Sequence, residues 1–179
     1  MNQPLLIVDV QTGFINEFTH HIPERITRLI QQEKHEPVLF TRFLNTTDGP
    51  YQRLLNWHSC SEEPETTIVP ELQPFTQPET VFSKPGLCGL PTELNHYLQA
   101  HRIEQILVVG IDTDMCVLKI AMDLFDIGIE PIVLTDCCAS TAGLQAHLAG
   151  LAVLSRNIGA NRLREAGLSG GLLAAPELS

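Results

Sequence analysis

Short apolar runs alternate along the chain with segments in which apolar residues recur at helical spacing. The runs predict five strands, at residues 5–8, 38–41, 80–83, 105–109 and 131–134, and a short sixth strand at 157–160. The segments with apolar residues at helical spacing predict helices at residues 22–30, 51–57, 90–100, 115–125 and 144–154. Because strands that alternate with helices pair in parallel with a helix over each crossover, we predict an α/β protein whose sheet is covered on both faces.

Two segments depart from this alternation. Residues 43–79 contain five prolines and a single short predicted helix. So long an irregular connection inside a compact domain is usually functional, and we expect it to shape a binding site. Residues from 167 onward show no periodicity. We therefore predict one domain at 1–165 and a tail at 166–179 that is mobile or packs on a neighbouring subunit.

Charge and cysteine content narrow the classes of function. The 11 Lys and Arg against 21 Asp and Glu give a net charge of -10, which disfavours nucleic-acid and membrane-surface partners. No signal-peptide pattern opens the chain and no apolar run reaches the roughly 18 residues of a membrane span, so we expect a cytoplasmic protein. The five cysteines are an odd number without a C-x-x-C pair, which predicts neither a disulfide framework nor a thiolate zinc site.

Three candidates for chemistry, Asp9, Lys84 and Cys116, follow three of the predicted strands. The carboxyl ends of parallel strands share one edge of a sheet, so these side chains can meet there. The amino end of a helix and a nearby lysine would favour a thiolate at Cys116, and Asp9 could accept and return a proton. Taken singly, Asp9 could instead cap a turn, Lys84 could be a solvated surface charge, and Cys116 could be a small core residue.

The motifs around these residues read Asp9-Val-Gln-Thr-Gly-Phe14, Ser83-Lys84-Pro85-Gly86 and Gly110-Ile-Asp-Thr-Asp-Met-Cys-Val117. They resemble the three signatures of the isochorismatase-like cysteine hydrolase family, which also contains nicotinamidases, N-carbamoylsarcosine amidases and ureidoacrylate amidases. The resemblance covers about residues 4 to 160. It implies a three-layer α/β/α fold with a six-stranded, mainly parallel sheet in the order 3-2-1-4-5-6.

The same resemblance implies roles for individual residues. Asp9, Lys84 and Cys116 would be the catalytic triad of an amide hydrolase that works through a thioester on Cys116. A non-proline cis peptide would join Ile111 to Asp112, and the N–H groups of Asp112 and Cys116 would form the oxyanion hole. No cofactor is implied.

The chain departs from the family that it resembles in the substrate pocket and in the metal site. Nicotinamidases bind a metal through an Asp-x-His pair and further histidines, whereas here Asp48 and His58 stand ten residues apart, so we expect no metal. Gln11, Phe14 and Trp57 are candidates to line a pocket for a small molecule, although Phe14 and Trp57 could equally be core residues.

Two other functions stay open on the sequence alone. One is an isochorismatase-type hydrolase of a vinyl ether, which in the family does not require the cysteine. The other is a non-catalytic binding or assembly module whose pocket is closed by the turn at Lys84-Pro85-Gly86. The resemblance also implies a homo-oligomer, either a dimer or a tetramer, to which Leu148, Leu151 and Val153 could contribute if the core does not use them.

Overall fold

A six-stranded sheet forms the centre of the molecule. The computed structural model describes residues 3–86 and 89–168. The strands are β1 (Leu5–Val8), β2 (Val38–Phe43), β3 (Val81–Lys84), β4 (Gln105–Ile111), β5 (Glu130–Ala139) and β6 (Leu163–Arg164). They lie in the order β3-β2-β1-β4-β5-β6, and every neighbouring pair is parallel. The predicted fold class and strand order are confirmed.

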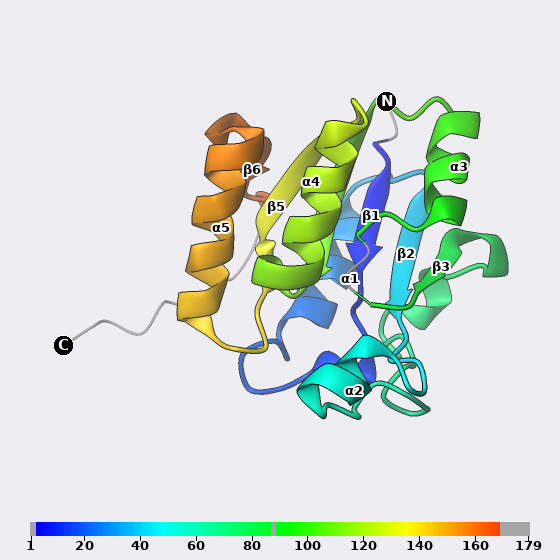
Figure 1. Ribbon diagram of the computed structural model, residues 1–179. Coiled ribbons are helices and arrows are strands. Elements are labelled where there is room, and N and C mark those ends of the chain that lie inside the picture. Colours follow the sequence, from blue (N-terminus) through cyan, green and yellow to red (C-terminus); the bar gives the residue numbers. More distant parts are fainter. Residues whose placement is uncertain (1–2, 87–88, 169–179) are drawn as a thin grey trace.

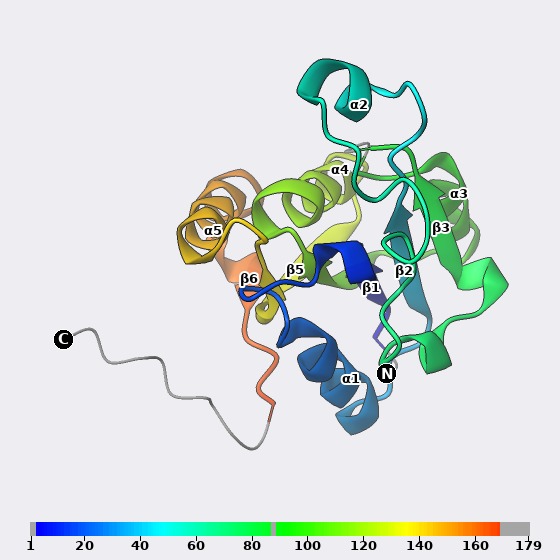
Figure 2. The same ribbon diagram turned by 90° about the horizontal axis from the view of Figure 1, so that it is seen from below.

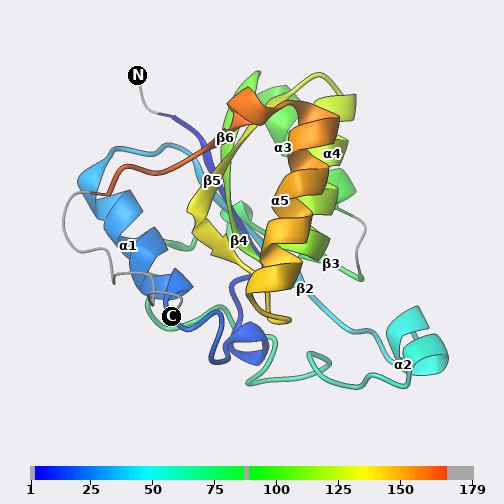
Figure 3. The ribbon, with the colours of Figure 1, turned by 90° about the vertical axis from the view of Figure 1, so that its left-hand side faces the viewer.

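Helices cover both faces of this sheet. They are α1 (Ile22–Gln32), α2 (Pro50–Leu55), α3 (Thr92–Ala100), α4 (Leu118–Asp126) and α5 (Leu144–Ile158). Figures 1 and 3 show α3, α4 and α5 on one face and α1 on the other. Figure 2 shows α2 set apart from both layers, beyond one end of the sheet. In the described part of the chain, no helix combines the length and the apolar character needed to cross a membrane.

Alternation along β1 divides the core between the two faces. Leu6 and Val8 belong to the apolar cluster beneath α3, α4 and α5, while Leu5 and Ile7 belong to the cluster beneath α1. All four side chains are fully buried, which is why this strand reads as a continuous apolar run. Since all four residues of β1 pair with β2 on one side and with β4 on the other, the point where β1 ends is held between two strands.

Gly110 lets β4 approach β1 closely at that end. Its backbone has φ +130°, and a Cβ there would lie 2.1 Å from the carbonyl oxygen of Val8. Any other residue would therefore push the two strands apart. The glycine brings the turn that follows β4 next to Asp9, the first residue after β1.

The end of the chain differs from its prediction. Residues 157–160 are not a strand, because α5 continues to Ile158 with Gly150, Leu154 and Ile158 buried at helical spacing, and Gly159 at φ +92° ends it. The sixth strand is instead the two residues of β6, too short to leave a pattern. Of the predicted tail, residues 166–168 are described, with the Ala166 N–H donating to the Asp136 carboxylate, and 169–179 lie outside the described residues.

Candidate active site

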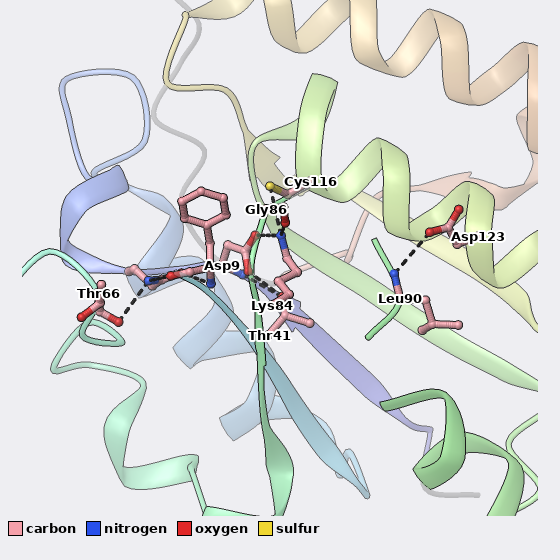
Figure 4. A network of polar contacts seen from close by, with 10 residues as sticks. Asp9, Thr41, Thr66, Lys84, Gly86, Leu90, Cys116 and Asp123 are labelled. Carbon is pink, nitrogen blue, oxygen red and sulfur yellow. Dashed lines mark hydrogen bonds and ion pairs between the residues drawn. The ribbon is translucent and has the colours of Figure 1, made fainter. Parts of the chain in front are cut away.

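The sheet brings Asp9, Lys84 and Cys116 together at one edge. The ammonium Nζ of Lys84 lies 2.7 Å from Oδ2 of Asp9 and 3.5 Å from Sγ of Cys116. Figure 4 shows the three side chains converging from the end of β1, the end of β3 and the turn before α4. The acid, the ammonium and the thiol therefore form one buried cluster.

Asp9 is held by its own backbone and by Thr41. Its φ is +50°, in the left-handed region that aspartate tolerates better than most residues. The Thr41 hydroxyl donates to Oδ1 at 2.7 Å, so one carboxylate oxygen faces Thr41 while the other faces Lys84 (Figure 4). The two oxygens thus have different partners, and the carboxylate has little freedom to rotate.

Lys84 is fully buried, with a relative exposure of 0 %. Its ammonium also donates to the carbonyl of Gly86 at 3.0 Å and lies 5.4 Å from the centroid of the Phe43 ring. Burial alone would lower the pKa of Lys84, but the charge of Asp9 and the contact with Cys116 outweigh it, so that its pKa is raised. Lys84 therefore stays charged and bridges the other two groups.

Cys116 lies in a turn of π-helix, Thr113–Val117, rather than in the first turn of a regular helix as its sequence predicted. Burial first, and then the charge of Asp9, raise the pKa of the thiol well above its ordinary value, although Lys84 acts in the opposite direction. Burial and Asp9 thus oppose the effect of Lys84 that the sequence analysis expected to favour a thiolate.

The turn between β4 and Cys116 is built around Asp112. The Ile111–Asp112 peptide is cis, and the carbonyl of Asp112 accepts from the N–H groups of Met115 and Val117. The Asp112 carboxyl group accepts from the N–H of Thr141 at 2.6 Å and from its hydroxyl at 2.9 Å. Burial raises the pKa of this carboxyl group, while the two bonds from Thr141 lower it. The turn is thereby tied to the segment that follows β5.

Helix α5 supports the same turn from behind. The hydroxyl of Thr113 and Nδ1 of His147 share a hydrogen bond of 2.8 Å. One turn further on, a Cβ at Gly150 would lie 2.7 Å from Cα of Asp114, so the helix and the turn are in backbone contact. Burial lowers the pKa of His147, which favours the neutral ring. Thr113 and Gly150 are both buried.

A pocket of ≈ 360 Å³ opens onto the Cys116 side chain. Its lining comes from the start of the chain, the irregular connection, the turn after β4 and the segment after β5: Gly13, Phe14, Asn16, Phe43, Tyr51, Leu55, Trp57, Ser59, Asp112, Met115, Cys116 and Thr141. Phe43 contacts the other three aromatic rings, with centroids 5.3 Å from Tyr51 and 5.8 Å from Phe14 and from Trp57. One wall of the pocket is therefore a continuous aromatic surface.

Comparison with known protein families identifies the family to which this fold and site belong. The family model "Isochorismatase domain" matches residues 3–162, which is most of the chain. The chain belongs to the isochorismatase family of hydrolases. The family resemblance noted in the sequence is thus confirmed.

Solved structures share the fold of this isochorismatase-family protein at low sequence identity. An isochorismatase-like hydrolase from Alkaliphilus metalliredigens has a TM-score of 0.79 at 19 % identity, with 93 % of this chain and 96 % of that chain covered. A nicotinamidase from Bacillus subtilis has a TM-score of 0.76 at 20 % identity, covering 92 % and 100 %. An N-carbamoylsarcosine amidase from Thermoplasma acidophilum has a TM-score of 0.74 at 19 % identity, covering 96 % and 100 %.

Of the three predicted pocket residues, Phe14 and Trp57 line the pocket of this family member and Gln11 does not. The Gln11 side chain is fully buried and donates to the carbonyls of Phe43 and Thr66, while its own oxygen accepts from the N–H of Phe43. Gln11 therefore fixes the end of β2 against the irregular connection. The hydrogen bonds of its side chain are thus made to backbone groups and not to the pocket.

Sequence reasoning missed several residues of the site, among them Thr41, Phe43, Tyr51 and Thr141. Thr41 had a usable signal, since a threonine that ends a predicted strand lies at the same sheet edge as Asp9. Phe43 ends β2 two residues beyond the predicted strand, Tyr51 lies on the short predicted helix, and Thr141 follows β5. Nothing in the sequence indicates that these three segments meet at one pocket. For a metal, no group of three or more suitable His, Cys, Asp or Glu side chains gathers anywhere within 3–86 and 89–168.

Proposed function

We propose that this protein is a cofactor-independent cysteine hydrolase that cleaves the C–N bond of a small carboxamide or ureido compound. The observation that carries the proposal is the buried cluster of Asp9, Lys84 and Cys116, of which Cys116 lines the pocket. A nucleophile, a proton acceptor and a fixed positive charge in mutual contact are the parts that acyl transfer needs.

In the first step, Asp9 accepts the thiol proton as Sγ attacks the carbonyl carbon. The thiol contacts Asp9, so the two groups are placed for this proton transfer. Lys84 stays charged beside both groups and stabilises the negative charge as it moves from the carboxylate to the sulfur. The carbonyl oxygen becomes an oxyanion.

The oxyanion would be held by the N–H groups of Asp112 and Cys116, on the wall where the pocket meets the nucleophile. Asp9 then returns its proton to the departing nitrogen, and ammonia or an amine leaves a thioester on Cys116. A water molecule that gives its proton to Asp9 attacks this thioester. The product acid leaves, the proton returns to sulfur, and the resting thiol is restored.

Two of the structural neighbours support the amide branch of the family. Their names identify them as a nicotinamidase and an N-carbamoylsarcosine amidase, and both act on C–N bonds. A vinyl-ether hydrolase would not require a thiol in this position. A closed, non-catalytic module is disfavoured because the pocket reaches Cys116.

The test is a screen of small amides and ureido compounds for ammonia release, combined with mass spectrometry of the quenched enzyme. We expect at least one compound to be hydrolysed and Cys116 to carry the acyl mass. Cys116→Ala should lower turnover about a thousandfold or more. Cys138→Ala, which removes a buried thiol that does not line the pocket, should retain turnover. Equal turnover of a vinyl ether by wild type and Cys116→Ala would overturn the thioester mechanism.

We also propose that the protein is a homo-oligomer. Leu144 and Leu148 are exposed four residues apart on α5, Phe18 lies beside Gly143, and Val153 is exposed further along the helix. Leu151, by contrast, packs against the core. Light scattering should give the mass of a dimer or tetramer, and Leu148→Glu should lower it; a monomeric wild type would contradict the proposal.

A further inference from the structure

We infer that the pocket selects uncharged, planar amides and rejects amides that carry a carboxylate. This inference rests on the proposed function, because it names the class of substrate for the same site. It follows from where the cationic side chains of this chain lie, from the acidic groups around the pocket and from the aromatic wall.

All cationic side chains of the chain are accounted for. The sequence holds 11 Lys and Arg and 7 His, and every one of these residues lies within 3–86 or 89–168. None of them lines the pocket. Lys84 contacts Cys116, which lines the pocket, but Lys84 is fully buried and its ammonium is paired to Asp9 and bonded to Gly86. A carboxylate in the pocket would find no free positive charge from this chain.

The groups that do surround the pocket are acidic or neutral. The Asp112 carboxyl group forms part of its wall, and both of its oxygens accept from Thr141. A neighbouring hollow, which shares Trp57 and Ser59 with the pocket, is lined by Glu62, Glu63 and Glu65 alongside a single histidine, His58. An anion entering here would lose its hydration and meet like charge.

The shape and surface of the pocket favour a flat ligand. Phe14, Phe43, Tyr51 and Trp57 form its aromatic wall, and Phe43 lies nearly perpendicular to Tyr51, at 88°. Planar groups pack on such rings by stacking or by edge-to-face contacts. An uncharged amide can also form hydrogen bonds with neutral donors and acceptors in the pocket wall. The volume of ≈ 360 Å³ is near the lower end for ligand pockets, which run from about 300 to 1,000 Å³, and suits a single ring.

The chain contains one tryptophan, and it lines the pocket, so its fluorescence reports binding there directly. We would titrate the Cys116→Ser variant, which cannot form the thioester, with two ligands of matched shape. Terephthalamide is neutral, and 4-carbamoylbenzoate replaces one of its amides by a carboxylate. We expect terephthalamide to bind at least about tenfold more tightly.

A second experiment introduces a positive charge at the rim of the pocket. Leu55 lines the pocket and is 68 % exposed, while its neighbour Leu54 is 75 % exposed and does not line it. Leu55→Arg should lower the preference for terephthalamide over 4-carbamoylbenzoate about tenfold, and Leu54→Arg should leave this preference unchanged.

The inference is overturned if 4-carbamoylbenzoate binds Cys116→Ser as tightly as terephthalamide, or if neither ligand changes the fluorescence. Because binding is measured without turnover, the result is separate from the proposed function. Failure to detect ammonia release or a thioester would reject the hydrolase and leave the binding preference standing.

Discussion

Lys84 and Asp9 form an ion pair from which water is excluded, since both side chains have 0 % exposure. Such a pair contributes little net stability, because the desolvation of two charges offsets most of their attraction. Removing one partner is a different matter, since the other is then left as an unpaired charge in the interior. The pair is therefore expected to be a requirement of the site more than a source of stability.

Single and double substitutions of this pair should be strongly non-additive. Lys84→Met and Asp9→Asn are each expected to lower the free energy of unfolding by about 3–5 kcal/mol. The double variant Asp9→Asn/Lys84→Met should lose much less than the sum of the two, because no charge remains buried. Urea denaturation of the four proteins measures the cycle. Additive losses would show that the two charges do not interact.

The reactivity of Cys116 should follow its raised thiol pKa. Alkylation by iodoacetamide, mapped by mass spectrometry, is expected to be slow near about pH 7 and to accelerate as the pH passes the ordinary thiol range of about 8 to 9. In Lys84→Met the profile should move to higher pH, since Lys84 lowers the pKa of this thiol.

Lys119→Met is the matched control for that experiment. Lys119 lies on α4 next to the same turn, but its partner is Asp123 and its side chain is partly exposed. The control should keep the wild-type profile, and circular dichroism should verify that both variants are folded. Rapid alkylation of the wild type in acid, unaffected by Lys84→Met, would show that the lysine does not act on the thiol.

Among the elements, α5 supports the turn that carries Cys116, the proposed nucleophile, without contributing a side chain to the pocket. Its Gly150 touches the backbone of the π-helical turn, and its His147 bonds to Thr113 within that turn. The turn also carries Asp112 and Cys116, both of which line the pocket. A change in the packing of α5 should therefore alter the position and the reactivity of the Cys116 sulfur.

Gly150→Ala should be destabilising even though alanine is the better helix former. The added Cβ would lie 2.7 Å from Cα of Asp114, and neither backbone can yield easily. We expect a loss of about 1–3 kcal/mol and slower alkylation of Cys116. Ala149→Gly, at an exposed position one residue earlier, should cost about 1 kcal/mol through helix propensity and leave alkylation unchanged. Equal alkylation of both variants would contradict the role given to α5.

Long periodic elements were predictable from the sequence, and short or aperiodic ones were not. The fully buried run of β1 and the amphipathic α1 carry their own signals. The polar residues Thr135 and Asp136 suggested that β5 ended there, yet it continues to Ala139 while Asp136 pairs with Arg25 on α1. Tertiary contacts of this kind override a local pattern, and no single-sequence reading contains them.

Residues of the candidate site were predictable where a strand end or a family motif marked them. Asp9, Lys84 and Cys116 satisfied both conditions, and the structure brings them together. Phe43 lies two residues beyond the predicted end of its strand and Tyr51 lies on a short helix, and no family motif marks either of them. The raised pKa of Cys116 could not be predicted either, since it depends on burial more than on neighbours in sequence.

Across the whole molecule, titration of buried thiols couples stability to pH. Burial, with Glu65 beside Cys60 and Asp136 beside Cys137, raises the pKa of each of these thiols to about 12. The unfolded chain releases thiol protons near about pH 9, whereas the folded protein retains them. This contribution to stability is therefore complete below about pH 9 and is lost as the pH rises toward 12.

Urea unfolding near pH 8 and pH 10.5 tests that coupling. We expect stability to fall at the higher pH, with a fully buried thiol such as Cys137 accounting for at most about 1.4 kcal/mol per pH unit. Cys137→Ala should reduce the difference between the two conditions. Leu134→Ala, a buried and non-titrating position on the same strand, should lower stability by a similar amount at both. A pH dependence identical in all three proteins would exclude the thiol.

The contact of one carboxylate, one ammonium and one thiol makes the cluster electroneutral. In the proposed first step, moving the proton from sulfur to Asp9 would exchange a carboxylate for a thiolate and leave the total charge at zero. The net charge of the buried cluster therefore stays constant during that step. Only the distribution of charge within the cluster changes, and the surrounding groups respond to that change alone. A neutral substrate preserves this balance from binding until the oxyanion forms.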